Sequence, residues 1–120
     1  MSPRPLLSLA VLIPLAAFTA GCGPSLPPSK PLAQLSPVER QGYDIYQTRC
    51  AGCHYAESQS SLHGPGLQGL YKKRFLPSGA PANDDRVTDA IRNGRALMPP
   101  FRNNLDDSDL NALLAYLHTL

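Results

Sequence analysis

Cys50-Ala51-Gly52-Cys53-His54 is the stretch that decides how this 120-residue chain folds. Two thiols separated by two residues match the two vinyl groups of a porphyrin, and a histidine directly after them is placed to bind the iron. The pentapeptide therefore predicts one covalently attached haem c, held by Cys50 and Cys53, with His54 as an axial ligand of the iron.

Two other kinds of site use a Cys-x-x-Cys pair. Structural zinc normally takes four protein ligands, yet beyond the motif the chain offers only Cys22, His63 and His118. A redox dithiol belongs to a strand-to-helix junction, and the sequence has no strand pattern of that kind. A zinc-binding or dithiol interaction module is therefore kept only as a remote alternative to haem.

Residues 1–21 carry the features of an export signal. A lone arginine near the N-terminus precedes an apolar run over 6–18 that is shorter than a bilayer span. Thr19-Ala20-Gly21-Cys22 resembles the bacterial lipobox, except that a large aliphatic residue is usual at its first position. We expect a lipoprotein-type signal peptide and a lipidated Cys22, with an unlipidated secreted form as the alternative. The protein would then be exported to the periplasm and anchored to a membrane surface by its lipid.

Residues 22–36 are expected to form a tether between the lipid and a folded domain over 37–120. Prolines recur through this segment among small and polar residues, a composition that favours stiff, extended backbone. Four of its fifteen residues are proline, so the segment offers little apolar surface for a core.

The charge balance argues against nucleic acid as a partner. Eleven Lys and Arg residues against nine Asp and Glu residues give a net charge of +2, and no basic domain stands out. Six basic residues are candidates for steering an acidic redox partner, with a solvated surface as the alternative. They are Lys72, Lys73, Arg74, Arg92, Arg95 and Arg102.

Helix signals appear on both sides of a long loop. Ser36-Pro37-Val38-Glu39 is a capping signature, and it starts a helix that leads to Cys50. A second helix is capped by Asn83 and stops near Gly94, and the last begins at Asp106. The expected buried faces are Val38, Gly42, Ile45 and Tyr46 in the first helix, Val87, Ala90 and Ile91 in the second, and Leu110, Leu113, Leu114 and Leu117 in the third.

The stretch 55–81 has the composition of a loop, with one short helical turn expected within 67–74. A loop of this length in a compact domain usually wraps something, and a haem would serve. Because no strand pattern and no repeat appears, the fold class is predicted to be all-α. The folded part has a thin core of its own, so we expect the polypeptide without haem to be largely unfolded.

Met98 is the only methionine after the initiator. It lies in Leu97-Met98-Pro99-Pro100-Phe101, where two prolines stiffen the backbone between the second and third helices. A thioether is a neutral, soft ligand that favours ferrous iron. Met98 is therefore the predicted second axial ligand, with His63 as the alternative.

Taken in chain order, the first helix, the Cys50–His54 motif, Met98 and the last helix resemble the class I monohaem cytochromes c over residues 37–120. Gly42 and Tyr46 are similar to the glycine and aromatic of that family's N-terminal helix. Leu113 and Tyr116 are similar to the residues of the C-terminal helix that crosses it. The resemblance implies a small cytochrome c fold, in which these two helices cross beside one covalently bound haem.

The resemblance also implies roles for individual residues. Pro65 matches the proline whose carbonyl accepts a hydrogen bond from the proximal histidine, so His54 would donate from Nδ1 and bind iron through Nε2. Met98 matches the distal ligand. With iron ligated on both faces, the family resemblance implies one-electron transfer between periplasmic or membrane redox partners, without enzymatic activity or a small-molecule substrate. The alternative is a haem-bearing subunit of a periplasmic oxidoreductase complex, such as a dehydrogenase or a sulfur-oxidising complex.

Overall fold

The computed structural model describes residues 26–120, so the predicted signal peptide and Cys22 lie outside the described residues. Its order of elements is η1 (Leu32–Gln34), α1 (Pro37–Arg49), η2 (Leu70–Lys72), α2 (Asp84–Asn93) and α3 (Asp107–Leu117), where η marks a 3₁₀ turn. Residues 26–120 contain two isolated β-bridges and no strand. The all-α prediction is confirmed. Within the same range, no helix combines the length and the hydropathy needed to cross a membrane.

Helix α1 begins with the predicted capping box. The Ser36 hydroxyl accepts from the Glu39 amide at 3.4 Å, and the Glu39 carboxylate accepts from the Ser36 amide at 2.6 Å. Pro37 takes the first helical position, where its missing N–H leaves no donor unpaired. Lys30 adds an ion pair to the Glu39 carboxylate at 2.7 Å. These contacts fix the direction in which α1 runs towards Cys50.

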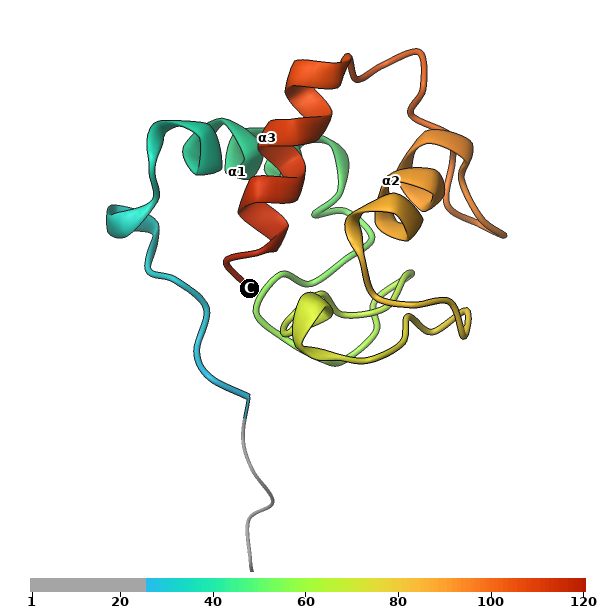
Figure 1. Cartoon of the computed structure of the whole chain (residues 1–120), viewed down its shortest axis with the longest axis horizontal. Coiled ribbons are helices and arrows are strands. Elements are labelled where there is room, and N and C mark those ends of the chain that lie inside the picture. The colour runs from blue at the N-terminus through green and yellow to red at the C-terminus, as the bar shows by residue number, and fades with distance from the viewer. Residues whose placement is uncertain (1–25) are drawn as a thin grey trace, which may run out of the picture.

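Helices α1 and α3 cross in close contact, as Figure 1 shows for the green and red ribbons. Gly42 is buried at the crossing, and a Cβ there would overlap the carbonyl oxygen of Ala112. Tyr46 and Tyr116 pack beside it with ring centroids 5.5 Å apart. The predicted crossing of the first and last helices is therefore present, and glycine is what permits the short distance between the backbones.

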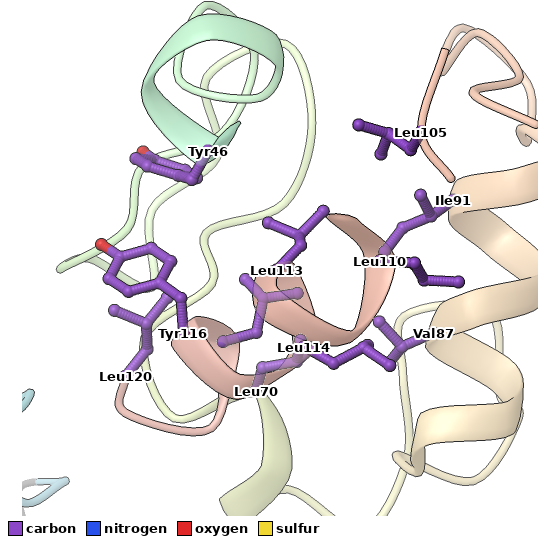
Figure 2. Close-up of a cluster of buried hydrophobic side chains, with 11 residues drawn as sticks. Tyr46, Leu70, Val87, Ile91, Leu105, Leu110, Leu113, Leu114, Tyr116 and Leu120 are labelled. Atoms are coloured by element: carbon purple, nitrogen blue, oxygen red, sulfur yellow. The ribbon is translucent and has the colours of Figure 1, made fainter. Parts of the chain in front are cut away.

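The hydrophobic core lies between α3 and α2 and continues to the tyrosines of the crossing (Figure 2). Leu113, at 1% exposure, is its most deeply buried large side chain. Val87 and Ile91 reach it from α2, so the faces predicted for both helices are confirmed at these positions. The buried residues of α3 are Leu110, Ala112, Leu113, Leu114, Tyr116 and Leu117.

Helix α2 is held at both ends by the residues that its sequence signals named. The Asn83 side chain accepts from the Arg86 amide at 3.0 Å and caps the first turn. At the other end Gly94 has φ +71°, a conformation that glycine adopts without strain. With ψ 171°, Gly94 lies in a region of backbone conformation that is open almost only to glycine, and the helix ends there as predicted.

The helical pattern predicted that Val38 is buried, and this prediction is wrong, because its side chain is 48% exposed. It lies in the first turn of α1, four residues before the Gly42 contact with α3, and the crossing buries only the residues around that contact. Ile45, also expected on the buried face, is half-buried against the core.

The segment before α1, which Figure 1 draws in blue, makes contacts with the folded part of the chain from Leu26 onward. The Lys30 amide donates to the Thr119 carbonyl at 2.8 Å, and a Cβ on Gly69 would overlap the side chain of Leu26. Leu35 packs against the core. Residues 26–35 of the expected tether therefore make specific contacts with the folded part.

The loop from 55 to 81 is irregular apart from η2, which falls inside the predicted helical turn. The His118 side chain is half-exposed and makes two contacts with other parts of the chain. Its ring stacks on Tyr71 with centroids 3.7 Å apart, and Nε2 lies 2.9 Å from the Asp84 carboxylate. These contacts join η2, the start of α2 and the end of α3, and so close the loop against the helices.

Candidate functional site

The C-terminal end of α1 delivers Cys50, Cys53 and His54 to one place. The Cys50 amide donates to the Tyr46 carbonyl at 2.8 Å, which completes the helix. The amides of Cys53 and His54 then both donate to the Cys50 carbonyl, at 3.0 and 2.9 Å. This tight turn holds the two thiol-bearing residues and the histidine on one short piece of backbone.

His54 is fixed in orientation by Pro65. Its Nδ1 lies 2.8 Å from the Pro65 carbonyl oxygen, the contact that the family resemblance implies. A carbonyl oxygen only accepts hydrogen bonds, so the proton must reside on Nδ1 and the lone pair on Nε2. A neutral imidazole with a free Nε2 is the form that ligates a metal, and the carbonyl partner raises its basicity.

Two further contacts at His54 were not predicted from the sequence. The Tyr46 hydroxyl donates to the His54 carbonyl at 2.6 Å, which ties the motif back to α1. Gly64 lies so close to the imidazole that a Cβ there would come within 2.8 Å of Nδ1. Its amide also donates to the Cys53 carbonyl at 2.8 Å. The Gly64-Pro65-Gly66 triplet was the available signal, because two glycines around a proline mark a backbone that other groups approach closely.

Met98 comes from a later part of the chain, the segment between α2 and α3. It is half-buried, and its backbone pairs with that of Arg95 through hydrogen bonds of 2.8 and 3.1 Å. The Phe101 amide donates to the Ile91 carbonyl at 3.0 Å, which fastens the end of the Met98–Phe101 segment to α2. The thioether is thus presented from a segment held at both ends.

A single cavity of about 500 Å³ brings the proximal motif and Met98 together. Cys50, Cys53, His54, Pro65 and Met98 all line it. The remaining walls are mainly apolar and include Leu67, Leu70, Leu76, Val87, Ile91, Phe101, Leu113 and Leu117. A mostly apolar cavity of this size with a few convergent ligating groups is typical of a cofactor site. The residues present fit a haem that has thioether links on one side and a ligand above and below its iron.

The alternatives to haem fit this site less well. Burial raises the pKa of the Cys50 thiol to about 11, and the nearby Cys53 adds to the shift. Redox dithiols instead lower the pKa of the attacking cysteine to about 3.5–7.5. Within residues 26–120, no group of three or more His, Cys, Asp and Glu side chains is arranged to hold a metal. Neither a reactive dithiol nor a zinc site is supported.

The structure also locates His63, the alternative axial ligand, and the basic residues that could steer a partner. His63 lines the cavity but lies on the proximal side, where its amide donates to the Cys53 carbonyl at 3.2 Å. Of the six basic candidates for partner steering, Arg95 alone lines the cavity, and Arg49 joins it there without having been anticipated. Arg92 instead pairs with Asp107. Two arginines, Arg49 and Arg95, are therefore the basic residues that line the cavity.

Comparison with known proteins finds a family and several relatives that this chain resembles. Residues 37–117 match the family model described as cytochrome C oxidase, cbb3-type, subunit III. Cytochrome c6 of Tetradesmus obliquus is 29% identical over 77 residues, which cover 64% of this chain and 84% of that protein. Cytochrome c6 of Bryopsis maxima is 28% identical over 76 residues, or 63% of this chain and 84% of that protein.

A second kind of relative is a component of an oxidase. The cbb3-type cytochrome c oxidase subunit CcoP of Azospirillum sp. (strain B510) is 32% identical over 85 residues. The match covers 67% of this chain but only 28% of that subunit. The similarity therefore extends over the folded domain and corresponds to a small part of the larger protein.

Proposed function

The chain belongs to the cytochrome C oxidase, cbb3-type, subunit III family of class I c-type cytochromes, and from this premise we propose that it is a one-electron carrier with one covalently bound haem c. The observation that supports the proposal is the cavity, which is lined by Cys50, Cys53 and His54 of the motif and by Met98. The alternating ferric and ferrous states of a haem supply the one-electron chemistry.

The chain's own residues determine how such a group would behave. Cys50 and Cys53 would hold it covalently, and the Pro65 carbonyl keeps the His54 ring in the orientation that frees Nε2. Met98 would complete the axial pair and favour the reduced state. If His54 and Met98 both bind the iron, no position would be left on it for oxygen or peroxide. This arrangement favours electron transfer between proteins over turnover of a small substrate.

Redox proteins are the partners that the site suits. Leu97 lines the cavity and is 91% exposed, so it marks the place where the cavity reaches the surface. Arg49 and Arg95 line the same cavity and are also exposed. A partner would approach here, over an apolar contact with positive charge beside it, and neither nucleic acid nor a small-molecule substrate is needed.

The second candidate function is that of a haem-bearing subunit in a periplasmic oxidoreductase complex. The similarity to a CcoP oxidase subunit favours it, because that relative is named as part of an oxidase. Mild extraction followed by size-exclusion chromatography separates the two functions. A free carrier elutes at the mass of the single chain, whereas a subunit elutes with a larger catalytic partner.

For location we propose export and anchoring through Cys22, with residues 1–21 as the signal peptide. Four Cα steps join Cys22 to Leu26, and even a fully extended chain of that length spans about 14 Å. Since Leu26 and Lys30 contact the domain, a lipid on Cys22 would hold the haem domain close to the membrane surface. Mass spectrometry of the N-terminal peptide tests this. A diacylglycerol-modified Cys22 supports it, and an unmodified cysteine or a downstream cleavage site contradicts it.

The carrier proposal is tested by producing the protein together with a haem-maturation system. Haem should remain with the chain after denaturation, and the Cys50→Ser/Cys53→Ser variant should lose it. A potentiometric titration should then follow a one-electron Nernst curve. Haem that is extracted by acidic solvent from the unaltered chain would refute covalent attachment.

A further inference from the structure

The turn that presents Met98 has a backbone conformation that is unusual for its residue. Between Arg95 and Met98, which pair through reciprocal backbone hydrogen bonds, lie Ala96 and Leu97. Ala96 has φ +48° and is the one non-glycine residue with positive φ in the part of the chain that the structure describes. A two-residue hairpin turn with positive φ at its first position alone has the pattern of a type II′ turn, which normally takes glycine there.

The position of Ala96 is enforced by its surroundings. A Cβ on Gly94 would lie 2.5 Å from the Met98 carbonyl oxygen, so the chain leaves α2 in close contact with the segment that returns from the turn. Beyond Met98, the backbone bond from Phe101 to Ile91 holds the far end. With both ends fixed, the turn has to close at Ala96. An alanine in this region is disfavoured roughly five- to thirty-fold against glycine, or about 1–2 kcal/mol.

We propose that Ala96 is a positioning residue whose strained backbone makes Met98 more readily displaced from the iron than a glycine turn would. The inference rests on the proposed role of Met98 as an axial ligand. Strain of this kind persists only while the surrounding contacts hold the turn in place. A thioether bound to the iron would be one such contact, added to the backbone bonds of Met98 and Phe101, so its release would leave the turn with fewer constraints against relaxing. Leu97 is exposed at the tip, so no other part of the described chain covers the outer side of the turn. A neutral nitrogen donor entering from solvent would therefore compete with Met98 more easily.

The test uses the haem-loaded full chain in the ferric state and imidazole as the competing ligand. Displacement is followed through the loss of the weak red absorption band of methionine-ligated iron. Ala96→Gly should raise the imidazole concentration at the midpoint about three- to tenfold, because part of the relief is offset by the freedom glycine gains in the released turn. Ala96→Val should lower the midpoint, since a β-branched side chain tolerates positive φ less well.

The matched control is Ala80→Gly, in the turn closed by the Phe75–Pro81 bridge, where φ is not positive. It should leave the imidazole midpoint unchanged and lower the denaturant midpoint slightly, whereas Ala96→Gly should raise the denaturant midpoint. Suppose that the unaltered protein shows the red band but Ala96→Gly leaves the imidazole midpoint unchanged or lowers it. That result would overturn this inference while leaving Met98 as the ligand. Absence of the band from the unaltered protein would instead overturn Met98 as the ligand and the inference with it.

Discussion

Substitution of Gly42 by alanine tests the helix crossing on which the site is built. The added Cβ would overlap the carbonyl oxygen of Ala112 and come within 2.8 Å of the Tyr116 Cβ. Both are parts of α3 that no side-chain rotation moves out of the way. The two helices must therefore separate, and the packing between Tyr46 and Tyr116 must loosen with them.

The expected size of the effect follows from two opposing contributions. Overpacking a tight contact lowers the free energy of unfolding by about 1–3 kcal/mol. Because the atoms that obstruct the new Cβ belong to the backbone and cannot rotate away, we expect a cost at or above the upper end of that range, about 3–4 kcal/mol. Alanine is the better helix former and returns about 1 kcal/mol. The free energy of unfolding should thus fall by about 2–3 kcal/mol, which is a large share of the stability of a domain this small.

Guanidinium denaturation of the haem-loaded protein, followed by far-ultraviolet circular dichroism, measures this change. Gly52→Ala is the matched control, because a Cβ at Gly52 meets no atom within 4 Å and the residue has no positive φ. We expect its unfolding free energy to stay within about 0.5 kcal/mol of the parent. If Gly42→Ala were equally harmless, the close crossing of α1 and α3 would be wrong.

The remaining predictions concern hydrogen bonds around α1. Tyr46→Phe removes the donor to the His54 carbonyl and should lower the free energy of unfolding by about 1–2 kcal/mol; an unchanged denaturant midpoint would count against that bond. Ser36→Ala removes the helix cap and should cost about 1 kcal/mol in the same assay, with Ser108→Ala, exposed in α3, as a control near zero. The hydrogen bonds from Lys30 and then Ser36 lower the pKa of Glu39, so its stabilising effect is complete above its unfolded-state pKa of about 4.3 and is lost as the pH falls through the lower folded-state value. Thermal melts of Glu39→Gln should therefore vary less with acid pH than those of the parent, and parallel curves would contradict this.

Local sequence signals predicted the helices well because capping is decided within a few residues. Ser36 and Asn83 both cap the helices expected of them through contacts three residues away. The same locality explains the failure at Val38. Helical periodicity gives the face of a side chain but not how far along α1 the neighbouring α3 extends, and that depends on the crossing at Gly42.

The candidate site was predicted unevenly for a similar reason. The residues of the Cys50–His54 motif lie on adjacent backbone, so their spacing alone indicated a joint role. Pro65 was named from the family resemblance, and Met98 from its place before two prolines as the only methionine after the initiator. The structure brings both to the cavity that His54 lines. The contact of Gly64 with the imidazole could not be derived from spacing, because it depends on how the loop folds back over the motif.

The positive φ of Ala96 is a feature that the sequence alone could not predict. Alanine carries no sequence signal for a type II′ turn, and its conformation follows from constraints at Gly94 and Phe101 on either side. The packing of residues 26–35 is comparable, since a proline-rich composition indicates extended backbone but not what that backbone contacts. Both features depend on contacts with residues distant in the sequence, so neither could be predicted from the local sequence pattern.

The central claim, that one covalent haem is ligated by His54 and Met98 and cycles by single electrons, is tested most directly by the visible spectrum of the oxidised and the dithionite-reduced protein. The account predicts a sharp reduced α-band of the c type, together with a red methionine–iron band that is present only in the oxidised form and is abolished in Met98→Ala. A c-type spectrum without that red band would contradict the ligand assignment and reopen the iron to another ligand or a substrate. No haem absorption after competent maturation would contradict the account as a whole.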